Sequence, residues 1–327
     1  MNKLSKALPN NDRQLRWIAV AVTVLIAGLI SLWGIYGIKE YGLALFILTP
    51  IFIGACPSVI YGLKKEMSRQ DAWMLGLVTL GVFTVGLLIF AIEGLICIAM
   101  AAPIGIILTW VGSLIGHAII TKKPGSATNV MLIFVCAIPS TAFIEKGYAP
   151  ALTSVVTSIE IKASPEVVWN NVVEFPQLNQ PTEFIFKTGI AYPINATIEG
   201  KGIGAVRYCN FTTGSFVEPI TVWDENKLLS FNVAEQPAPM KEISFWDINA
   251  PHLHDYFVSK KGQFKLSVLP NGNTLLEGTT WYYHRIKPAF YWQIWSNYII
   301  HKIHERVLNH IKDHSEDRTE TSKNLHQ

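Results

Sequence analysis

Between Ala72 and Ile120 the chain carries a single charged side chain, Glu93. A stretch this long and this apolar has too few polar groups to form the surface of a soluble domain. At 1.5 Å per helical residue it can cross about 30 Å of hydrocarbon twice. The pair Glu93-Gly94 stands near its middle, where a tight turn can separate two spans. The chain is therefore expected to fold around a membrane-spanning helical part.

Three further apolar runs extend this part in both directions. Residues 17–38 are long enough to span and too long for the apolar core of a cleaved signal peptide, so a retained anchor is expected. The run Val130–Ile144 is the weakest, because as a helix it reaches only about 22 Å. The sequence thus predicts a cytoplasmic N-terminus at 1–16 and a membrane domain at 17–147 with about five spans, 17–38, 41–63, 72–92, 95–120 and 130–147.

Positive residues predict the orientation of these spans. Nine Lys and Arg residues fall on the side of the N-terminus and two fall on the other side. Because positive residues concentrate in cytoplasmic segments, this bias predicts a cytoplasmic N-terminus. Five spans then place the C-terminal half outside the cytoplasm, at the outer face of a bacterial inner membrane. If the fifth run is only re-entrant, the C-terminal half is cytoplasmic instead.

Composition excludes several classes of partner and cofactor. The net charge of +3 is too small to indicate a nucleic-acid partner. Four cysteines show no metal-ligand or disulfide spacing. The histidines of His252–Asp255, and the pairs at helical spacing His301/His304 and His310/His314, lack an accompanying carboxylate signature and are interpreted as solvated. No metal and no cofactor are therefore expected.

The C-terminal half has the alternating and helical hydrophobic patterns of a soluble α+β domain. Val155, Thr157, Ile159 and Ile161 alternate on one face of an expected strand, and Ser164-Pro165 suits the start of a short helix. About six antiparallel strands separated by turn residues follow, including a hairpin at Asn271-Gly272. A long amphipathic helix closes the domain. The expected limits are 151–314, followed by a disordered tail at 315–327.

This order resembles a known superfamily. The segments "IEIKASPEVVWNNVVEF" and "LEGTTWYY", the meander and the C-terminal helix are similar to SRPBCC proteins, the START and polyketide cyclase/dehydrase-like group. The resemblance covers about residues 153–314 and implies a helix-grip fold with a hydrophobic cavity. It implies no single activity and no shared catalytic residue. The expected fold is thus a multi-pass α-helical membrane domain followed by an α+β helix-grip domain, a curved antiparallel sheet around a long helix.

Candidate cavity residues come from the strands, the closing helix and one long loop. The loop Glu235–Asp255 interrupts an otherwise tight meander and is a candidate entrance. Both faces of the last strand carry aromatic side chains, so alternation alone leaves open which face meets the helix. The candidates are Arg207, Cys209, Glu218, Phe231, Phe245, Trp246, Trp281, Tyr283, Trp295 and Ile299.

These features favour membrane-anchored binding of a hydrophobic small molecule or lipid. One alternative is an enzyme of cyclase, dehydrase or hydrolase type, which would need polar residues clustered in the cavity. No catalytic residue can be named, so an enzyme is the less favoured reading. The other alternative is a module that docks a protein or the bilayer, and it would show a filled sheet–helix gap with exposed aromatics. Expected partners are the membrane and an apolar ligand.

Overall fold

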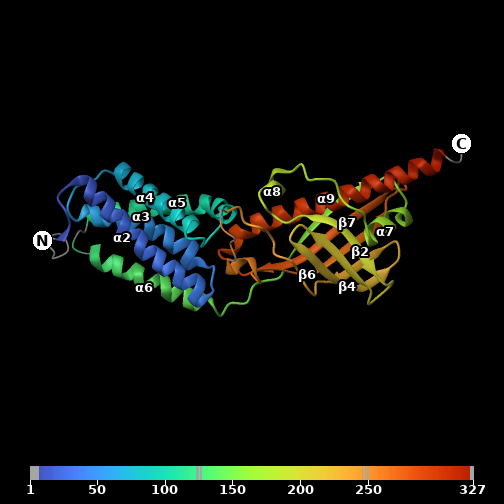
Figure 1. Ribbon diagram of the computed structural model, residues 1–327, viewed down its shortest axis with the longest axis horizontal. Coiled ribbons are helices and arrows are strands. Elements are labelled where there is room, and N and C mark those ends of the chain that lie inside the picture. The colour runs from blue at the N-terminus through green and yellow to red at the C-terminus, as the bar shows by residue number, and fades with distance from the viewer. Residues whose placement is uncertain are drawn as a thin grey trace. The chain divides into compact units, whose positions relative to one another are not determined.

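A computed structural model describes residues 7–122, 125, 127–244, 246, 248 and 250–324 of the chain. The chain divides into two compact units (Figure 1). The first comprises Met1–Ala149, Glu242–Pro251 and Arg285–Ala289, and the second comprises Pro150–Lys241, His252–His284 and Phe290–Gln327. This division differs from the sequence-based one because two later segments belong to the first unit.

The first unit is a bundle of apolar helices. Among its described residues, five helical segments are long and apolar enough to cross a membrane. The fifth has 19 residues and spans about 29 Å as a helix, more than its apolar run alone suggested. The helices are α2 (Asp12–Leu32), which continues as the π-helix η1 (Trp33–Ile38), then the π-helix η2 (Ala44–Leu48), α3 (Thr49–Gly62), α4 (Arg69–Ile89), α5 (Leu95–Lys122) and α6 (Ala127–Glu145).

Helices α3 and α5 approach each other through glycines. A Cβ atom added to Gly54 would lie 2.0 Å from the carbonyl oxygen of Thr109, and one added to Gly112 would lie 2.1 Å from that of Ile51. A Cβ on Gly116 would lie 2.5 Å from the carbonyl oxygen of Ala55. The two backbones are therefore in direct contact, as small residues allow in membrane helix pairs. The GxxxG at Gly112 and Gly116, weak as a sequence signal, lies in this interface.

Two glutamates cap helix starts in the first unit. The Glu145 carboxylate accepts hydrogen bonds from the backbone N–H groups of Leu43 at 2.8 Å and Ala44 at 3.3 Å. The carboxylate also lies against Gly42, where a Cβ would come within 2.2 Å of Oε2. A negative charge at the positive end of a helix dipole satisfies N–H groups that have no partner inside the helix.

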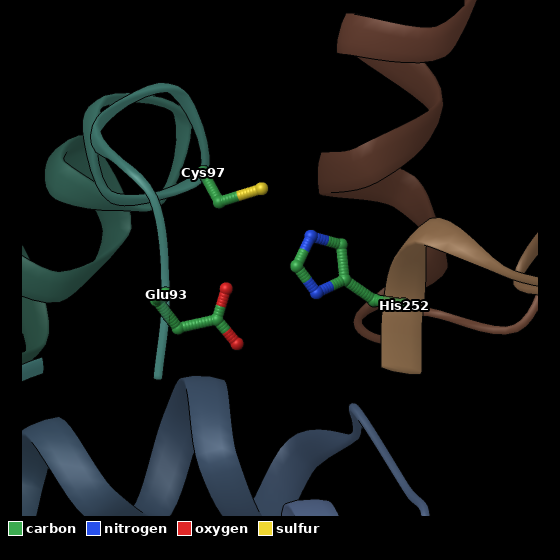
Figure 2. A group of neighbouring side chains, drawn as sticks. All are labelled: Glu93, Cys97 and His252. Carbon is green, nitrogen blue, oxygen red and sulfur yellow. The ribbon is translucent and has the colours of Figure 1, made fainter. Parts of the chain in front are cut away.

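Helix α5 begins in the same way. Its first turn is approached by Glu242, which accepts hydrogen bonds from Ile96 N–H at 3.1 Å and Cys97 N–H at 3.3 Å. A Cβ on Gly94 would lie 2.1 Å from Glu242 Oε2, so glycine is what admits the carboxylate. Figure 2 shows Glu93 on the stretch that leads into α5 and Cys97 in its first turn. Glu93 thus lies in the turn between two apolar helices, where the sequence placed it.

The second unit is a seven-stranded antiparallel sheet with the long helix α9 packed against it (Figure 1). Strands β2 to β7 follow one another as a meander, and β1 joins the sheet beside β7. The elements are β1 (Thr153–Ile161), α7 (Pro165–Val173), α8 (Phe184–Lys187), β2 (Pro193–Glu199), β3 (Val206–Phe211), β4 (Gly214–Asp224), β5 (Leu228–Asn232), the 3-10 helix η4 (Pro251–Leu253), β6 (Phe257–Val268), β7 (Thr274–His284) and α9 (Ala289–Asn324).

One apolar core joins the sheet, α7 and α9. Ile161 of β1, Leu276 of β7 and Ile311 of α9 are fully buried within it, and Val168 of α7 joins them. The expected inward face of β1 is correct. Val155 and Ile161 are buried, Thr157 and Ile159 on the same face are half-buried, and the residues on the other face are exposed. Helix α9 continues to Asn324, so the segment after Ser315 is helical where a disordered tail was expected.

Candidate functional site

A cavity of about 140 Å³ lies between the sheet and α9 in the second unit. The helix contributes Ile299, Ile303 and Val307 to its wall, and the sheet contributes Phe231 and Gly278 among others. A Cβ added to Gly278 would lie 3.7 Å from Leu308 of the helix, an ordinary contact distance. The strand therefore leaves room at the point where a side chain would otherwise fill the gap.

The start of the long loop forms one side of this cavity. Residues 236–239 line it. The Gln236 amide donates to the Phe257 carbonyl oxygen at 2.6 Å and accepts from Ser259 N–H at 2.8 Å. The Ala238 carbonyl oxygen accepts from the Thr213 hydroxyl at 2.7 Å. Because these bonds tie the segment to β6 and to the turn between β3 and β4, it is a fixed wall.

A buried ion pair stands in the cavity wall. Arg207 of β3 and Glu218 of β4 are directly opposite in the strand register, and they are 2% and 6% exposed. The guanidinium donates from Nη1 to Glu218 Oε2 and from Nε to the Val173 carbonyl oxygen at 3.1 Å. Three aromatic rings surround its carbon atom with centroids 5.5 to 5.6 Å away, those of Phe175, Phe231 and Phe264.

The surroundings raise the pKa of both members of this pair. Burial raises the pKa of Glu218, and Arg207 offsets only part of that shift. Burial acts to lower the pKa of Arg207, and the Glu218 carboxylate together with Cys209 outweighs it, so that this pKa lies above its usual value. Stacked aromatic faces attract the cation further. A buried charge with its partner and hydrogen bonds in place is satisfied, whereas removal of either partner leaves an uncompensated charge. Arg207 and Glu218 therefore bond to each other, Arg207 also bonds to the protein backbone, and the pair has a structural role in the cavity wall.

Cys209 is a thiol in this wall. It is 6% exposed and lies two residues from Arg207 on the same strand face. Burial, with the nearby Glu218 carboxylate, raises the pKa of Cys209 to about 12. Since the thiolate is the nucleophilic form, a thiol with this pKa is unreactive at neutral pH. Cys209 contributes apolar surface to the cavity.

A chain of polar side chains reaches the cavity from the β1 side of α9. Thr157 Oγ1 lies 2.8 Å from His301 Nδ1 and 3.0 Å from His304 Nδ1. His304 Nε2 lies 2.8 Å from Thr280 Oγ1. Both His304 and Thr280 line the cavity. Burial, with the neighbouring His301, lowers the pKa of His304 to about 4, so this imidazole is neutral at pH 7.

The structure brings together half of the residues proposed from the sequence. Arg207, Cys209, Glu218, Phe231 and Ile299 line the cavity. Trp281, Tyr283 and Trp295 are half-buried elsewhere and do not belong to its lining. Trp246 is 56% exposed and belongs to the first unit, and Phe245 lies outside the described residues.

The assignment of Trp281 and Tyr283 to the cavity is wrong because they face away from the helix. Tyr282, between them, is fully buried, and Gly278 and Thr280 line the cavity. The outward aromatic rings instead meet lysines of the neighbouring strand. The ammonium of Lys261 lies 4.9 Å from the Trp281 ring and that of Lys260 lies 5.6 Å from the Tyr283 ring.

The sequence interpretation missed three polar residues of the site, Thr157, Thr280 and His304. His301 and His304 were interpreted as solvated, but both reach a hydroxyl of the sheet. Their spacing of three on α9 and the inward position of Thr157 on β1 were visible in the sequence. The missing information was the rotation of the helix against the strand. The other histidine considered, His252, lies in η4 (Figure 2).

Comparisons with known proteins match only by structure. No protein-family model matches the chain, and no curated protein matches it. Norcoclaurine synthase from Thalictrum flavum shares 11% identity over 53% of this chain and 99% of its own, with a TM-score of 0.35. The di-domain ARO/CYC StfQ of the steffimycin biosynthetic pathway shares 8% over 59% of this chain and 61% of its own, with a TM-score of 0.35.

Ginseng major latex-like protein 151 from Panax ginseng shares 15% identity over 50% of this chain and 97% of its own, with a TM-score of 0.31. These structures are helix-grip proteins, and they cover the C-terminal half of the chain. With TM-scores below 0.5, these matches carry no argument about this chain. The arrangement seen in the second unit, a seven-stranded antiparallel sheet with a long C-terminal helix packed across it, is that of the helix-grip fold.

Proposed function

We propose that the second unit binds a small, uncharged, apolar molecule in the cavity between its sheet and α9. The observation that carries this proposal is an apolar space of about 140 Å³ beside Gly278, walled by a loop segment that is hydrogen-bonded in place. A docking module without a ligand would have this gap filled by side chains. The open gap supports the binding interpretation.

The size of the cavity narrows the ligand. An engineered protein cavity of about 150 Å³ binds benzene, whereas sites for drug-sized ligands occupy roughly 300 to 1,000 Å³. The cavity of this chain, at about 140 Å³, therefore fits a molecule of one ring. A lipid chain is larger than this volume. We accordingly favour a ring-sized ligand over the lipid that the sequence also suggested.

The charge of the ligand follows from the ion pair. Arg207 and Glu218 satisfy each other inside the wall, so neither is available to neutralise a ligand charge. An ionised ligand would enter an apolar site unpaired, at a cost of several kcal/mol or more. This supports a neutral occupant.

The first unit supports a role at a membrane. Its five apolar helical segments are the candidates for the spans. An odd number of spans would put the second unit on the side opposite the N-terminus, outside the cytoplasm by the positive-inside rule. In this proposal the first unit keeps the cavity close to the bilayer, in which small apolar molecules concentrate.

The binding proposal is tested with toluene and the full chain in detergent. Burying one ring gains roughly 4 to 5 kcal/mol before association costs, so a dissociation constant of about 1 mM or weaker is expected. Gly278→Val should weaken binding at least tenfold because it fills the cavity. Gly81→Ala, in open space on α4, is the control and should leave binding unchanged.

Comparing variants in the same detergent cancels the uptake of toluene by micelles. Equal saturation of wild type and Gly278→Val would show that the probe binds elsewhere. That outcome, or no saturable binding by the wild type, overturns the proposal.

A further inference from the structure

Four polar side chains beside the cavity form a hydrogen-bonded chain, in the order His301, Thr157, His304 and Thr280. Thr157 Oγ1 is shared between His301 Nδ1 and His304 Nδ1, at 2.8 and 3.0 Å. A hydroxyl has one proton, so when it donates to one of these nitrogens it can only accept from the other. Thr280 Oγ1, 2.8 Å from His304 Nε2, either donates to that nitrogen or accepts from it. The direction of each bond is therefore linked to the next.

Two arrangements of protons satisfy the chain with the Thr157 hydroxyl donating to one histidine and accepting from the other. In the first, His301 Nδ1–H donates to Thr157, Thr157 donates to His304 Nδ1, and His304 Nε2–H donates to Thr280. In the second every direction is reversed: Thr280 donates to His304 Nε2, His304 Nδ1–H donates to Thr157, and Thr157 donates to His301 Nδ1. Each arrangement uses one neutral tautomer of each histidine.

The arrangements differ in what Thr280 offers to the cavity. In the first its hydroxyl accepts from His304, so its own proton is free to donate to a ligand. In the second that proton is committed to His304, and Thr280 can only accept. A ligand whose oxygen is only an acceptor can therefore bond to Thr280 in the first arrangement alone.

Several polar groups of the wall are already engaged, and the lining also includes Ser259, Lys261, Gln263 and Thr279. Among them, Thr280 is the hydroxyl bonded to His304. Arg207 and Glu218 are engaged with each other, and Cys209 is a buried thiol. The Gln236 amide is engaged by Phe257 and Ser259 of the neighbouring strand. Thr280 has one hydrogen-bond partner, which still leaves a donor or acceptor for an occupant. His304 is neutral at pH 7, as both arrangements require.

We propose that Thr280 is the polar anchor of the cavity, that the ligand is a ring-sized apolar molecule carrying one acceptor oxygen such as a carbonyl, and that its binding fixes the tautomers of His304 and, through Thr157, of His301. This inference rests on the proposed function, because it presupposes an occupied cavity. Thr157 and His304 act through Thr280 and are positioning residues.

The first experiment compares two probes of similar size, cyclohexanone and toluene, on the full chain in detergent. Thr280→Val keeps the shape of the side chain and removes the hydroxyl. It should weaken cyclohexanone binding about 3- to 10-fold and leave toluene binding within twofold. Thr197→Val, an exposed position on β2, is the matched control and should change neither.

The two proposals fail differently in this comparison. If neither probe saturates wild type, the binding proposal fails and the anchor fails with it. If toluene binds and Thr280→Val affects both probes equally, the cavity is real and the anchor is wrong.

The second experiment reads the tautomers directly from the ¹⁵N chemical shifts of the imidazole rings. Cyclohexanone should move His304 to the Nε2–H form and His301 to the Nδ1–H form, whereas toluene should move neither. In Thr157→Val the ketone should still act on His304, and the response of His301 should be lost. An unchanged His304 spectrum with bound ketone, or a His301 response that survives in Thr157→Val, overturns the coupling.

Discussion

Arg207 and Glu218 stand opposite each other on β3 and β4, and together they place a full ion pair inside the apolar wall of the cavity. The attraction between the two charges offsets the cost of removing them from water only while both residues are present. The pair therefore adds little net stability, but replacing one member alone strongly destabilises the fold.

Removing one member should destabilise the chain strongly. Glu218→Leu leaves the Arg207 cation buried without a counter-charge, and we expect a loss of about 3 to 5 kcal/mol in the free energy of unfolding. The double variant Arg207→Met/Glu218→Leu should recover most of this loss. Denaturant unfolding of the full chain in detergent measures both. Lys227→Met, in a solvent-exposed pair with Asp224, is the control and should have little effect.

A double variant no more stable than Glu218→Leu would show that the pair is needed for the packing of its aromatic surroundings rather than for charge balance. It would also remove the basis for expecting an uncharged ligand.

Stability should fall as the pH is lowered from about 6.5 towards 4, because of His304. Burial, with His301 nearby, lowers its folded-state pKa from 6.5 to about 4. In this window the unfolded chain binds a proton at this position and the folded chain does not. The free energy of unfolding therefore drops by up to about 1.4 kcal/mol per pH unit, and the contribution is fully restored above 6.5.

Unfolding measured across this pH range in wild type and His304→Gln isolates the contribution. The variant should show a shallower decline below pH 6.5, because it cannot take up the proton. Parallel curves for the two proteins would mean that His304 does not titrate in this window.

The glycine contact between α3 and α5 should tolerate no added methyl group. In Gly54→Ala the new Cβ would meet the backbone carbonyl oxygen of Thr109 at 2.0 Å, and backbone cannot turn aside as a side chain can. We expect a loss of about 1 to 3 kcal/mol as the helices separate. Gly81→Ala, with nothing within 4 Å, provides the same chemical change without a contact. Recovery of monodisperse protein after heating compares the two, and equal recovery contradicts the contact.

The positive-inside bias and five spans predict that the C-terminus lies outside the cytoplasm. A reporter active only in the cytoplasm should be silent when fused at the end of the chain. The same reporter inserted between Lys122 and Ala127 should be active, since that connection is expected inside. Activity at both positions would mean that α6 does not cross the membrane.

The order of elements was largely predictable from local patterns. Long apolar runs marked the helices of the first unit, and alternation marked β1 and most of the meander. The strand β2 carries a weak sequence signal because it opens with Pro193 and offers only Ile194, Ala196 and Ile198 as apolar positions. The end of α9 was placed too early because a polar sequence gives no packing signal even when it continues a helix.

The residues that line the cavity could not be predicted from local sequence patterns. Both faces of β7 carry aromatic residues, and only pairing with β1 and the crossing of α9 decide that Thr280 faces inward while Trp281 faces outward. Aromatic side chains do line the cavity, but they come from other strands, as Phe231 and Phe264 do, and not from Trp281 or Tyr283 of β7. On β7 the lining is made by Gly278 and Thr280, whose small size leaves the space open. Arg207 and Glu218 were predictable as a pair because they lie on adjacent inward-facing strand positions.

The cap on α5 has a consequence for the time at which the first unit is completed. Glu242 follows Ile96 by 146 residues, so at 5 to 20 residues per second it leaves the ribosome about 7 to 30 s later. For that interval the first turn of α5 exists without its carboxylate. The apolar bundle is thus finished by residues made after most of the meander, and the two units cannot be synthesised and folded strictly one after the other.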